Sequence, residues 1–236
     1  MKVSRNFSVH VQYILDQWVP PRIRDSKWFM YPPMRMVLGK SAGDFMTFKN
    51  SVFRMTPEQF SALYERTGDV QELQGETDLN QACIDEILKT INNRKVLEVG
   101  CGRGYLAKRL VKKNKVTACD IVIPEKLKRT KDGVKYMEAN IEALPFKDNS
   151  FEYVVTTHTL EHVQNLPKAI SELERVASKG LVIVVPKQRP YKYTFSLHTQ
   201  FFPYKWSLEN AFGTGKNTKI KDLGDWFYFK DMGRSR

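Results

Sequence analysis

From residue 78 onward, segments with apolar residues at helical spacing alternate with short, continuous apolar runs. The chain is therefore expected to alternate between helices and strands. Residues 79–91 carry apolar side chains at helical spacing, and residues 96–99 form a short apolar run typical of a buried strand. Four later apolar runs predict further strands, over residues 115–120, 134–138, 151–156 and 181–185. This order of elements is typical of an α/β fold built on a parallel sheet.

The connections refine this prediction. Residues 105–113 have helical spacing after the first strand, Pro167 opens a second helix, and Gly180 is expected to close the turn before the fifth strand. Residues 218–223 and 226–230 flank Gly224 and Asp225 as the strands of a two-residue hairpin would. The sheet should therefore end in an antiparallel pair.

Residues 1–75 do not share this pattern. Pro20-Pro21 and Pro32-Pro33 bracket an aromatic stretch and are expected to break regular structure. Thr56, followed by Pro57 and three residues later by Gln59, forms a capping-box helix start. We expect an N-terminal extension, residues 1–75, that packs as a lid on a domain of residues 76–236.

Composition limits the class of protein. The chain has 236 residues, 42% of them hydrophobic, which suits one α/β domain with additional elements. No apolar run approaches the roughly 18 residues of a membrane span, and the first residues lack the apolar core of a signal peptide. We expect a cytoplasmic protein without stable membrane insertion. The three cysteines form no Cys-x-x-Cys pair, so neither a disulfide framework nor a metal site is expected.

Charge leaves two alternatives open. Lys and Arg outnumber Asp and Glu by 38 to 26, giving a net charge of +12. Such an excess suits an anionic partner such as RNA, and it also suits ordinary solvation of exposed helices and loops.

A glycine-rich turn, Gly100-Cys101-Gly102-Arg103-Gly104, follows the first strand. Glycine lets the backbone turn sharply and lets a ligand approach, while the next helix supplies unpaired N–H groups. The dinucleotide fingerprint would place its last glycine where this chain has Tyr105, and Glu98 before the turn would repel a pyrophosphate. The turn therefore indicates a ligand that is cationic at one end and carries no phosphate.

The sequence Glu-x-Gly-x-Gly-x-Gly after a strand resembles motif I of the class I S-adenosyl-L-methionine (SAM) dependent methyltransferases, and the resemblance extends from about residue 78 to 185. Residues 143–155, followed by Leu160-Glu161-His162-Val163, resemble the type 11 subgroup, which acts on quinones, sterols, sugars and other small acceptors. The resemblance implies a Rossmann-like sheet, mostly parallel with a C-terminal antiparallel hairpin, and helices on both faces. The chain departs from this family in lacking a Pro-Gly-Gly turn before the fifth strand.

Several residues become candidates for binding the cofactor SAM. Asp120 ends the second strand about twenty residues after the glycine turn, where a carboxylate can bind both ribose hydroxyls. The resemblance implies that Asn140 bonds the adenine edge and that Ile141 packs on the ring. The full predicted set is Glu98, Gly100, Cys101, Gly102, Tyr105, Asp120, Ile121, Asn140, Ile141 and Thr157.

Methyl transfer mainly requires donor and acceptor to be held in line, and a base is needed only when the acceptor loses a proton. His158, at the end of the fourth strand, and His198 are the candidate bases, with a structural role equally open for each. Aromatic residues between 191 and 206 are placed to wall an acceptor pocket. We expect a small-molecule or glycan-like acceptor, with RNA methylated on an oxygen or a modified-base carboxylate as the alternative.

Two other functions compete with methyl transfer. His158-Thr159-Leu160-Glu161-His162 matches the His-x-x-Glu-His pattern of a zinc hydrolase. That pattern belongs inside a helix, whereas here it follows a strand, and it would leave the glycine turn and Asp120 unexplained. The second rival is a protein that binds SAM without catalysis, which only a turnover assay can separate from an enzyme.

Overall fold

The structure is a computed structural model that describes residues 13–15, 18–67 and 77–233. The chain divides into two compact units. One comprises residues 1–78 with 189–199, and the other comprises residues 79–188 with 200–236. The N-terminal region thus shares a unit with a short segment that follows the fifth strand, while a lid function for it stays a prediction.

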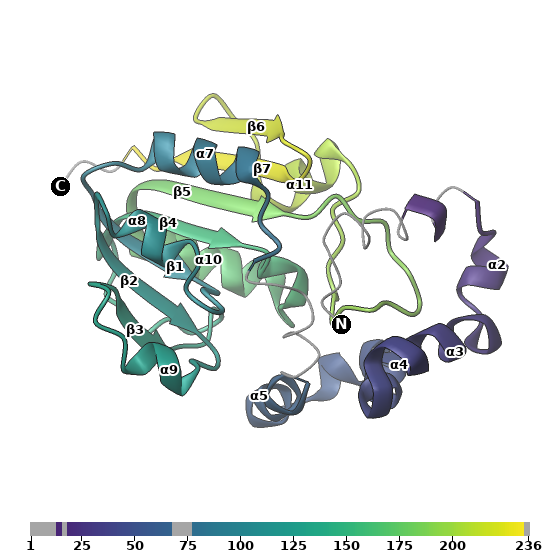
Figure 1. The fold of residues 1–236 in the computed structure, drawn as a ribbon. Coiled ribbons are helices and arrows are strands. Elements are labelled where there is room, and N and C mark those ends of the chain that lie inside the picture. Colours follow the sequence, from purple (N-terminus) through teal and green to yellow (C-terminus); the bar gives the residue numbers. More distant parts are fainter. Residues whose placement is uncertain (1–12, 16–17, 68–76, 234–236) are drawn as a thin grey trace. The chain divides into compact units, whose positions relative to one another are not determined.

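The larger unit contains a seven-stranded sheet in the order β3-β2-β1-β4-β5-β7-β6 (Figure 1). Its strands are β1 Lys95–Val99, β2 Lys115–Asp120, β3 Lys135–Glu138, β4 Phe151–Thr157, β5 Ala177–Val185, β6 Thr218–Asp222 and β7 Trp226–Asp231. The first five strands pair in parallel, and β7 pairs antiparallel with both β5 and β6. The predicted mostly parallel sheet with a C-terminal antiparallel hairpin is confirmed.

The register brings three strand ends together. Val99, the last residue of β1, lies opposite Cys119 of β2 on one side and Thr156 of β4 on the other. In the sheet, β2 and β3 lie on one side of β1, and β4 and β5 lie on the other. The strand order therefore reverses direction at β1, and open α/β sheets bind ligands at the carboxyl end of such a switch point.

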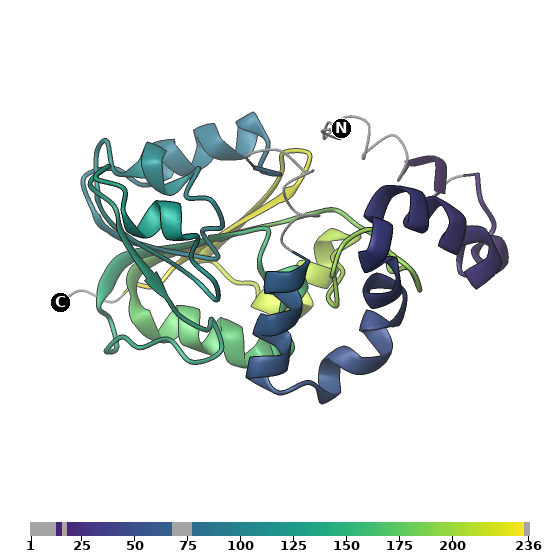
Figure 2. The same ribbon diagram turned by 60° about the horizontal axis from the view of Figure 1, so that its bottom comes forward.

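Helices cover both faces of this sheet. Figures 1 and 2 place α7, Gln81–Thr90, and α10, Leu166–Val176, on opposite sides of it. One face packs α7 and the short α8, Ala107–Leu110, against strand residues such as Val96 and Val155. The other face packs α10 and α11, Lys205–Phe212, against strand residues such as Leu97 and Val154. Adjacent residues of one strand thus face opposite sides of the sheet, as expected for strands buried on both faces.

Three predicted details are wrong. Gly180 does not close a turn but lies inside β5, where it pairs with Tyr153. A Cβ there would come within 2.5 Å of Tyr153 Cε1, so the glycine makes room for an aromatic ring within the sheet.

Only Ala107–Leu110 of the predicted helix over 105–113 is α-helical, because Gly104 at φ +72° extends the turn. The hairpin loop has three residues, 223–225, with Gly224 in the left-handed region.

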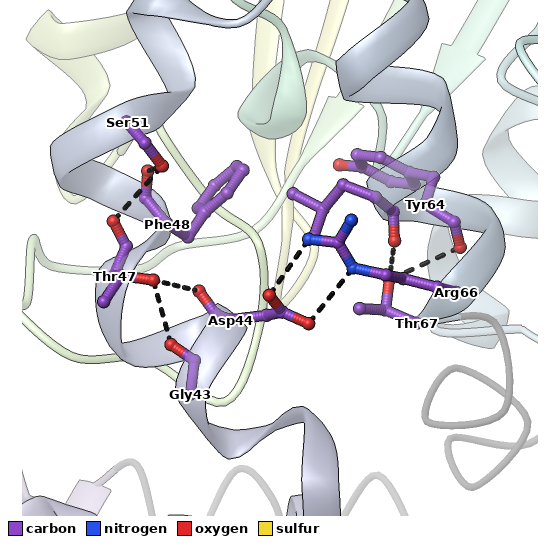
Figure 3. Close-up of polar contacts among 9 residues, drawn as sticks. Gly43, Asp44, Thr47, Phe48, Ser51, Tyr64, Arg66 and Thr67 are labelled. Carbon is purple, nitrogen blue, oxygen red and sulfur yellow. Dashed lines mark hydrogen bonds and ion pairs between the residues drawn. The ribbon is translucent and has the colours of Figure 1, made fainter.

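The N-terminal part of the smaller unit is mostly helical over residues 21–66, and its segment 189–199 has no helix or strand. Its α-helices are α2 Pro21–Arg24, α3 Lys27–Leu38, α4 Ala42–Ser51 and α5 Pro57–Arg66, with 3-10 turns η1 Gly39–Ser41 and η2 Val52–Arg54 between them. The predicted capping box of α5 is present, with Gln59 N–H donating to Thr56 Oγ1 at 3.3 Å. Arg66 of α5 forms a two-pronged ion pair with Asp44 of α4 at 3.2 and 3.0 Å (Figure 3).

The expectation that Pro32-Pro33 breaks regular structure is wrong, because both prolines lie inside α3. Each removes one backbone donor from the helix. Met30, Met34 and Leu38, spaced four residues apart, are buried along one side of α3 and hold the segment helical. The packing of this stripe therefore outweighs the local preference of proline.

The segment 189–199 is joined to these helices by polar contacts. Lys49 Nζ donates to the carbonyl oxygen of Tyr191, and the Arg24 guanidinium lies 4.4 Å from the Tyr191 ring centroid. The Lys192 N–H donates to Asp25 Oδ1 at 3.2 Å. Burial lowers the pKa of Lys49 to about 8, although Asp25 acts in the opposite direction.

Candidate cofactor and methyl-transfer site

The glycine turn leaves β1 in a left-handed conformation. Gly100, Gly102 and Gly104 have φ of +78°, +50° and +72°, values that side chains with a Cβ rarely adopt. The turn is held by the Cys119 carbonyl of β2, which accepts hydrogen bonds from the N–H groups of Gly100 and Cys101 at 2.8 and 3.1 Å. The backbone of β2 thus fixes the shape of the turn.

At two of these positions, neighbouring side chains leave no room for a Cβ, so only glycine fits. A Cβ on Gly100 would collide with Thr159, and a Cβ on Gly104 would lie 2.5 Å from the Tyr136 hydroxyl. Around Gly102, in contrast, a Cβ would meet no atom within 4 Å. Gly102 therefore borders open space, as expected where a ligand approaches the backbone.

Asp120 lies next to this open space. Its Oδ2 accepts from the Gly102 N–H at 2.7 Å, and its Oδ1 accepts from the Ile121 N–H at 2.7 Å. The two oxygens together offer about four lone-pair sites, so the carboxylate keeps acceptor capacity for a further donor. Burial raises the pKa of Asp120, and hydrogen bonds from Gly102, Ile121 and Val122 act against that rise.

Glu98 and Cys101 are buried beside the turn. Burial, reinforced by the Asp120 charge, raises the pKa of Glu98 well above its usual range, and the Ala107 N–H acts against this. Glu98 Oε2 is buried and has no hydrogen-bond partner among the described residues. Burial also raises the pKa of the Cys101 thiol, which therefore stays protonated and unreactive.

The residues predicted to contact adenine follow β3. Asn140 Oδ1 accepts from the Glu142 N–H at 2.8 Å, which closes a turn and leaves the amide NH2 group as the donor available to a ligand. Ile141 is partly buried against the core. Tyr105, after the glycine turn, has the Arg109 guanidinium 3.7 Å from its ring centroid.

His158 follows Thr157 at the end of β4 and lies between two buried carboxylates. Its Nδ1 is 3.5 Å from Glu161 Oε1, and its Nε2 is 3.4 Å from Asp225 Oδ2. The side chains of Glu161 and Asp225 are 1% and 5% exposed. Asn80 Nδ2 donates to Asp225 Oδ2 at 2.7 Å. His158 adopts φ +51°, which is uncommon for a residue with a side chain.

This surrounding determines the charge of His158. Burial by itself lowers the pKa of the imidazole, but the Asp225 and Glu161 carboxylates outweigh it and raise the pKa to about 10. The ring is therefore an imidazolium at neutral pH. An imidazolium can donate a proton or a hydrogen bond but cannot accept a proton, so this environment does not favour a general base in the resting protein.

The other candidates stay predictions. His198 belongs to the smaller unit, whereas His158 belongs to the larger one. For the zinc alternative, residues 158–162 follow the end of β4 and include the 3-10 turn η4, Leu160–His162. Both ring nitrogens of His158 face carboxylates. A zinc ligand needs an unprotonated ring nitrogen, so the zinc alternative gains no support at His158.

Sequence reasoning missed Thr159 and Asp225 as parts of this site. Thr159 contributes through its contact with Gly100, for which no sequence signal exists. Asp225 follows Gly224 in the hairpin, and its turn-forming role hid its contact with His158.

The residues fit SAM. Gly102 offers open backbone, Asp120 offers lone pairs suited to ribose hydroxyls, and Glu98 keeps a buried acceptor atom without a partner among the described residues. The cofactor-binding roles of individual residues stay predictions. Together, the sheet order, the glycine turn and the strand-end carboxylate define a class I, Rossmann-like SAM-dependent methyltransferase domain.

Comparison with known proteins narrows this class. Residues 97–185 match the family described as a methyltransferase domain. A malonyl-[acyl-carrier protein] O-methyltransferase from Halorhodospira halophila is 32% identical over 145 residues, covering 55% of this chain and 47% of that protein. Ajmaline N-methyltransferase from Rauvolfia serpentina is 30% identical over 102 residues, covering 39% of this chain and 35% of that protein. This chain thus matches less than half the length of either relative.

A solved structure supports the fold. A SAM-dependent methyltransferase from Thermotoga maritima is similar with a TM-score of 0.50 and 18% identity, covering 64% of this chain and 88% of that one. Residues 97–185 thus form a methyltransferase domain of the class I, type 11 kind, a family whose cofactor is SAM. Among the described residues, no helix has the length and apolarity to cross a membrane.

Proposed function

We propose that this chain transfers the methyl group of SAM to a small-molecule or glycan-like acceptor. The observation that carries the proposal is the open backbone at Gly102 beside the Asp120 carboxylate, at the switch point of the sheet. SAM supplies an electrophilic methyl group on a sulfonium, and the protein contributes binding, orientation and exclusion of water.

The cofactor's position follows from the residues around this turn. Asp120 receives the ribose hydroxyls through its remaining lone pairs, and the amide NH2 group of Asn140 faces the adenine edge. The acidic groups Asp120, Glu161 and Asp225 outnumber the one imidazolium of His158. That balance suits a ligand with a sulfonium and an ammonium group and a single carboxylate.

In this proposal His158 is a positioning residue. Its imidazolium links the end of β4 to the hairpin through Asp225 and to η4 through Glu161. The next residue, Thr159, packs on Gly100. Loss of the imidazolium would therefore loosen the support of the glycine turn, and an acceptor that must lose a proton would pass it to solvent or to another group.

Two observations favour a small acceptor over RNA. Both relatives named above methylate non-nucleic-acid acceptors according to their names. Part of the positive charge is also already compensated, because Lys128 lies 2.9 Å from Glu125 and 3.0 Å from Glu138. Paired lysines release fewer counterions on meeting phosphates than unpaired ones.

The test is a turnover screen with methyl-labelled SAM and the full chain. Pools of small hydroxylated, aminated and carboxylated acceptors, glycans, and total RNA would be incubated separately. Label in a small-molecule or glycan pool supports the proposal. Label only in RNA, with binding that weakens by about 0.7–0.9 log units per log unit of salt for each neutralised phosphate, would replace it with the RNA alternative. SAM binding without label in any pool would favour a non-catalytic protein.

A further inference from the structure

Exposed hydrophobic side chains are concentrated in the smaller unit. Among the described residues, large hydrophobic side chains are exposed at Tyr13, Ile14, Trp18, Ile23, Trp28, Tyr31, Met36, Val37, Phe53, Tyr204 and Trp206. Only Tyr204 and Trp206 lie in the larger unit. Scattered exposed apolar residues are ordinary, but a concentration of this kind marks an interaction surface.

The exposed apolar side chains centre on α3. Trp28, Tyr31, Arg35 and Met36 follow the spacing i, i+3, i+7 and i+8, so they share one side of the helix. We call these four residues the outer face of α3. Trp28 is 72% exposed and Met36 is 82% exposed, whereas the opposite side carries the buried stripe of Met30, Met34 and Leu38. The helix is therefore anchored in its unit on one side and apolar toward solvent on the other.

The charges around this face have one dominant sign. Between residues 18 and 43 the basic side chains are Arg22, Arg24, Lys27, Arg35 and Lys40, and the single acidic one is Asp25. Asp25 lies 3.5 Å from Arg24 and accepts from the Lys192 N–H. The exposed Lys27 and Arg35 thus flank Trp28 and Tyr31 without an acidic residue on the same helix.

We propose that the outer face of α3 docks on the surface of a membrane that contains anionic phospholipid. Trp and Tyr favour the boundary between water and hydrocarbon, Met36 enters the acyl layer, and Lys27 and Arg35 meet the lipid phosphates. A helix of 12 residues is about 18 Å long, too short to span a bilayer, so it lies in the plane of the interface.

Two other occupants fit less well. RNA would stack on Trp28 and Tyr31, but the aliphatic side chains of Ile23, Met36 and Val37 present no ring on which a base can stack. A second copy docking through the same face would bring a basic surface without acidic residues on α3 against an identical one, so the positive charges would stay uncompensated. An anionic lipid surface satisfies both the apolar and the basic groups.

The experiment is vesicle flotation of the full chain, with phosphatidylcholine vesicles and with vesicles containing about 30% phosphatidylglycerol. We expect flotation with the anionic vesicles only, reduced at high salt. Lys27→Glu with Arg35→Glu should lower partitioning at least about tenfold, and Trp28→Ser with Met36→Ser should do the same at low salt.

A matched control separates this face from net charge. Lys112→Glu with Lys113→Glu removes the same charge from exposed positions of the larger unit and should leave flotation nearly unchanged. Thermal unfolding of each variant checks that the fold persists. The proposal is overturned if the wild-type chain does not float with anionic vesicles, or if both charge-reversal pairs reduce flotation equally. It is also overturned if Lys27→Glu with Arg35→Glu abolishes RNA binding and leaves flotation intact.

Discussion

Asp225 Oδ2 lies 3.4 Å from His158 Nε2 and accepts a hydrogen bond from Asn80 Nδ2 at 2.7 Å. One carboxylate oxygen thus connects the end of β4, the start of α7 and the C-terminal hairpin. Because the carboxylate is buried and close to the imidazole, the pair binds a proton more tightly in the folded protein than a free histidine does. This relationship gives His158 a charge that its sequence position does not reveal.

The first prediction concerns the pH dependence of stability. The pKa of His158 is about 10 in the folded protein and about 6.5 when unfolded, so its stabilisation is complete below about pH 6.5 and is lost as the pH rises through 10. His158→Gln should cost about 3 kcal/mol of unfolding free energy at pH 6, and progressively less toward pH 10. Urea unfolding at several pH values measures this. Asp225→Asn should show the same trend, and a pH-independent loss in both variants would contradict the pairing.

A second prediction concerns the rate of methyl transfer. If His158 is a fixed imidazolium, the pH profile of kcat should lack an ascending limb near pH 6.5 that depends on this residue. His158→Gln should lower kcat/KM modestly and weaken SAM binding, because it loosens the support of the glycine turn. A loss of about 10²–10⁴ in kcat with unchanged SAM affinity, together with removal of such a limb, would instead establish His158 as the base.

A third prediction concerns Asp120. Replacing it with Ala removes the proposed ribose contacts, and hydrogen bonds to a charged group are worth about 1.5–3 kcal/mol. SAM affinity measured by calorimetry should fall at least about tenfold. Glu125→Ala, an exposed carboxylate on the following helix α9, Glu125–Lys128, is the matched control and should bind SAM normally. Unchanged affinity in Asp120→Ala would remove this residue from the site.

The glycine turn gives a fourth prediction. Gly100→Ala adds a Cβ that collides with Thr159, whereas Gly102→Ala adds one in open space, and both have the cost of a left-handed residue, about 1–2 kcal/mol. Thermal unfolding should therefore show a larger loss for Gly100→Ala. Thr159→Gly should partly rescue Gly100→Ala, and equal stability of the two alanine variants would show that the contact with Thr159 is unimportant. Gly102→Ala should mainly weaken SAM binding.

Much of the fold could be predicted from the sequence because its signals are local. Apolar periodicity located the strands of the sheet, three alternate glycines located the turn after β1, and the position of Asp120 at the end of β2 followed from spacing. The capping box at Thr56 and Gln59 was also readable, since both partners lie within one helical turn. Resemblance to a family then supplied the Rossmann-like sheet with helices on both faces, whereas the order of the strands came from the structure.

The tertiary structure decided what depends on partners distant in the chain. Gly180 belongs to a strand because the Tyr153 ring occupies the space of a side chain, and Pro32 and Pro33 are helical because a buried stripe holds α3. His158 is expected to be charged only because the fold brings Glu161 and Asp225 against it. Spacing and turn chemistry act over a few residues, whereas burial and electrostatic pairing depend on which distant segments meet, so only the folded chain determines them.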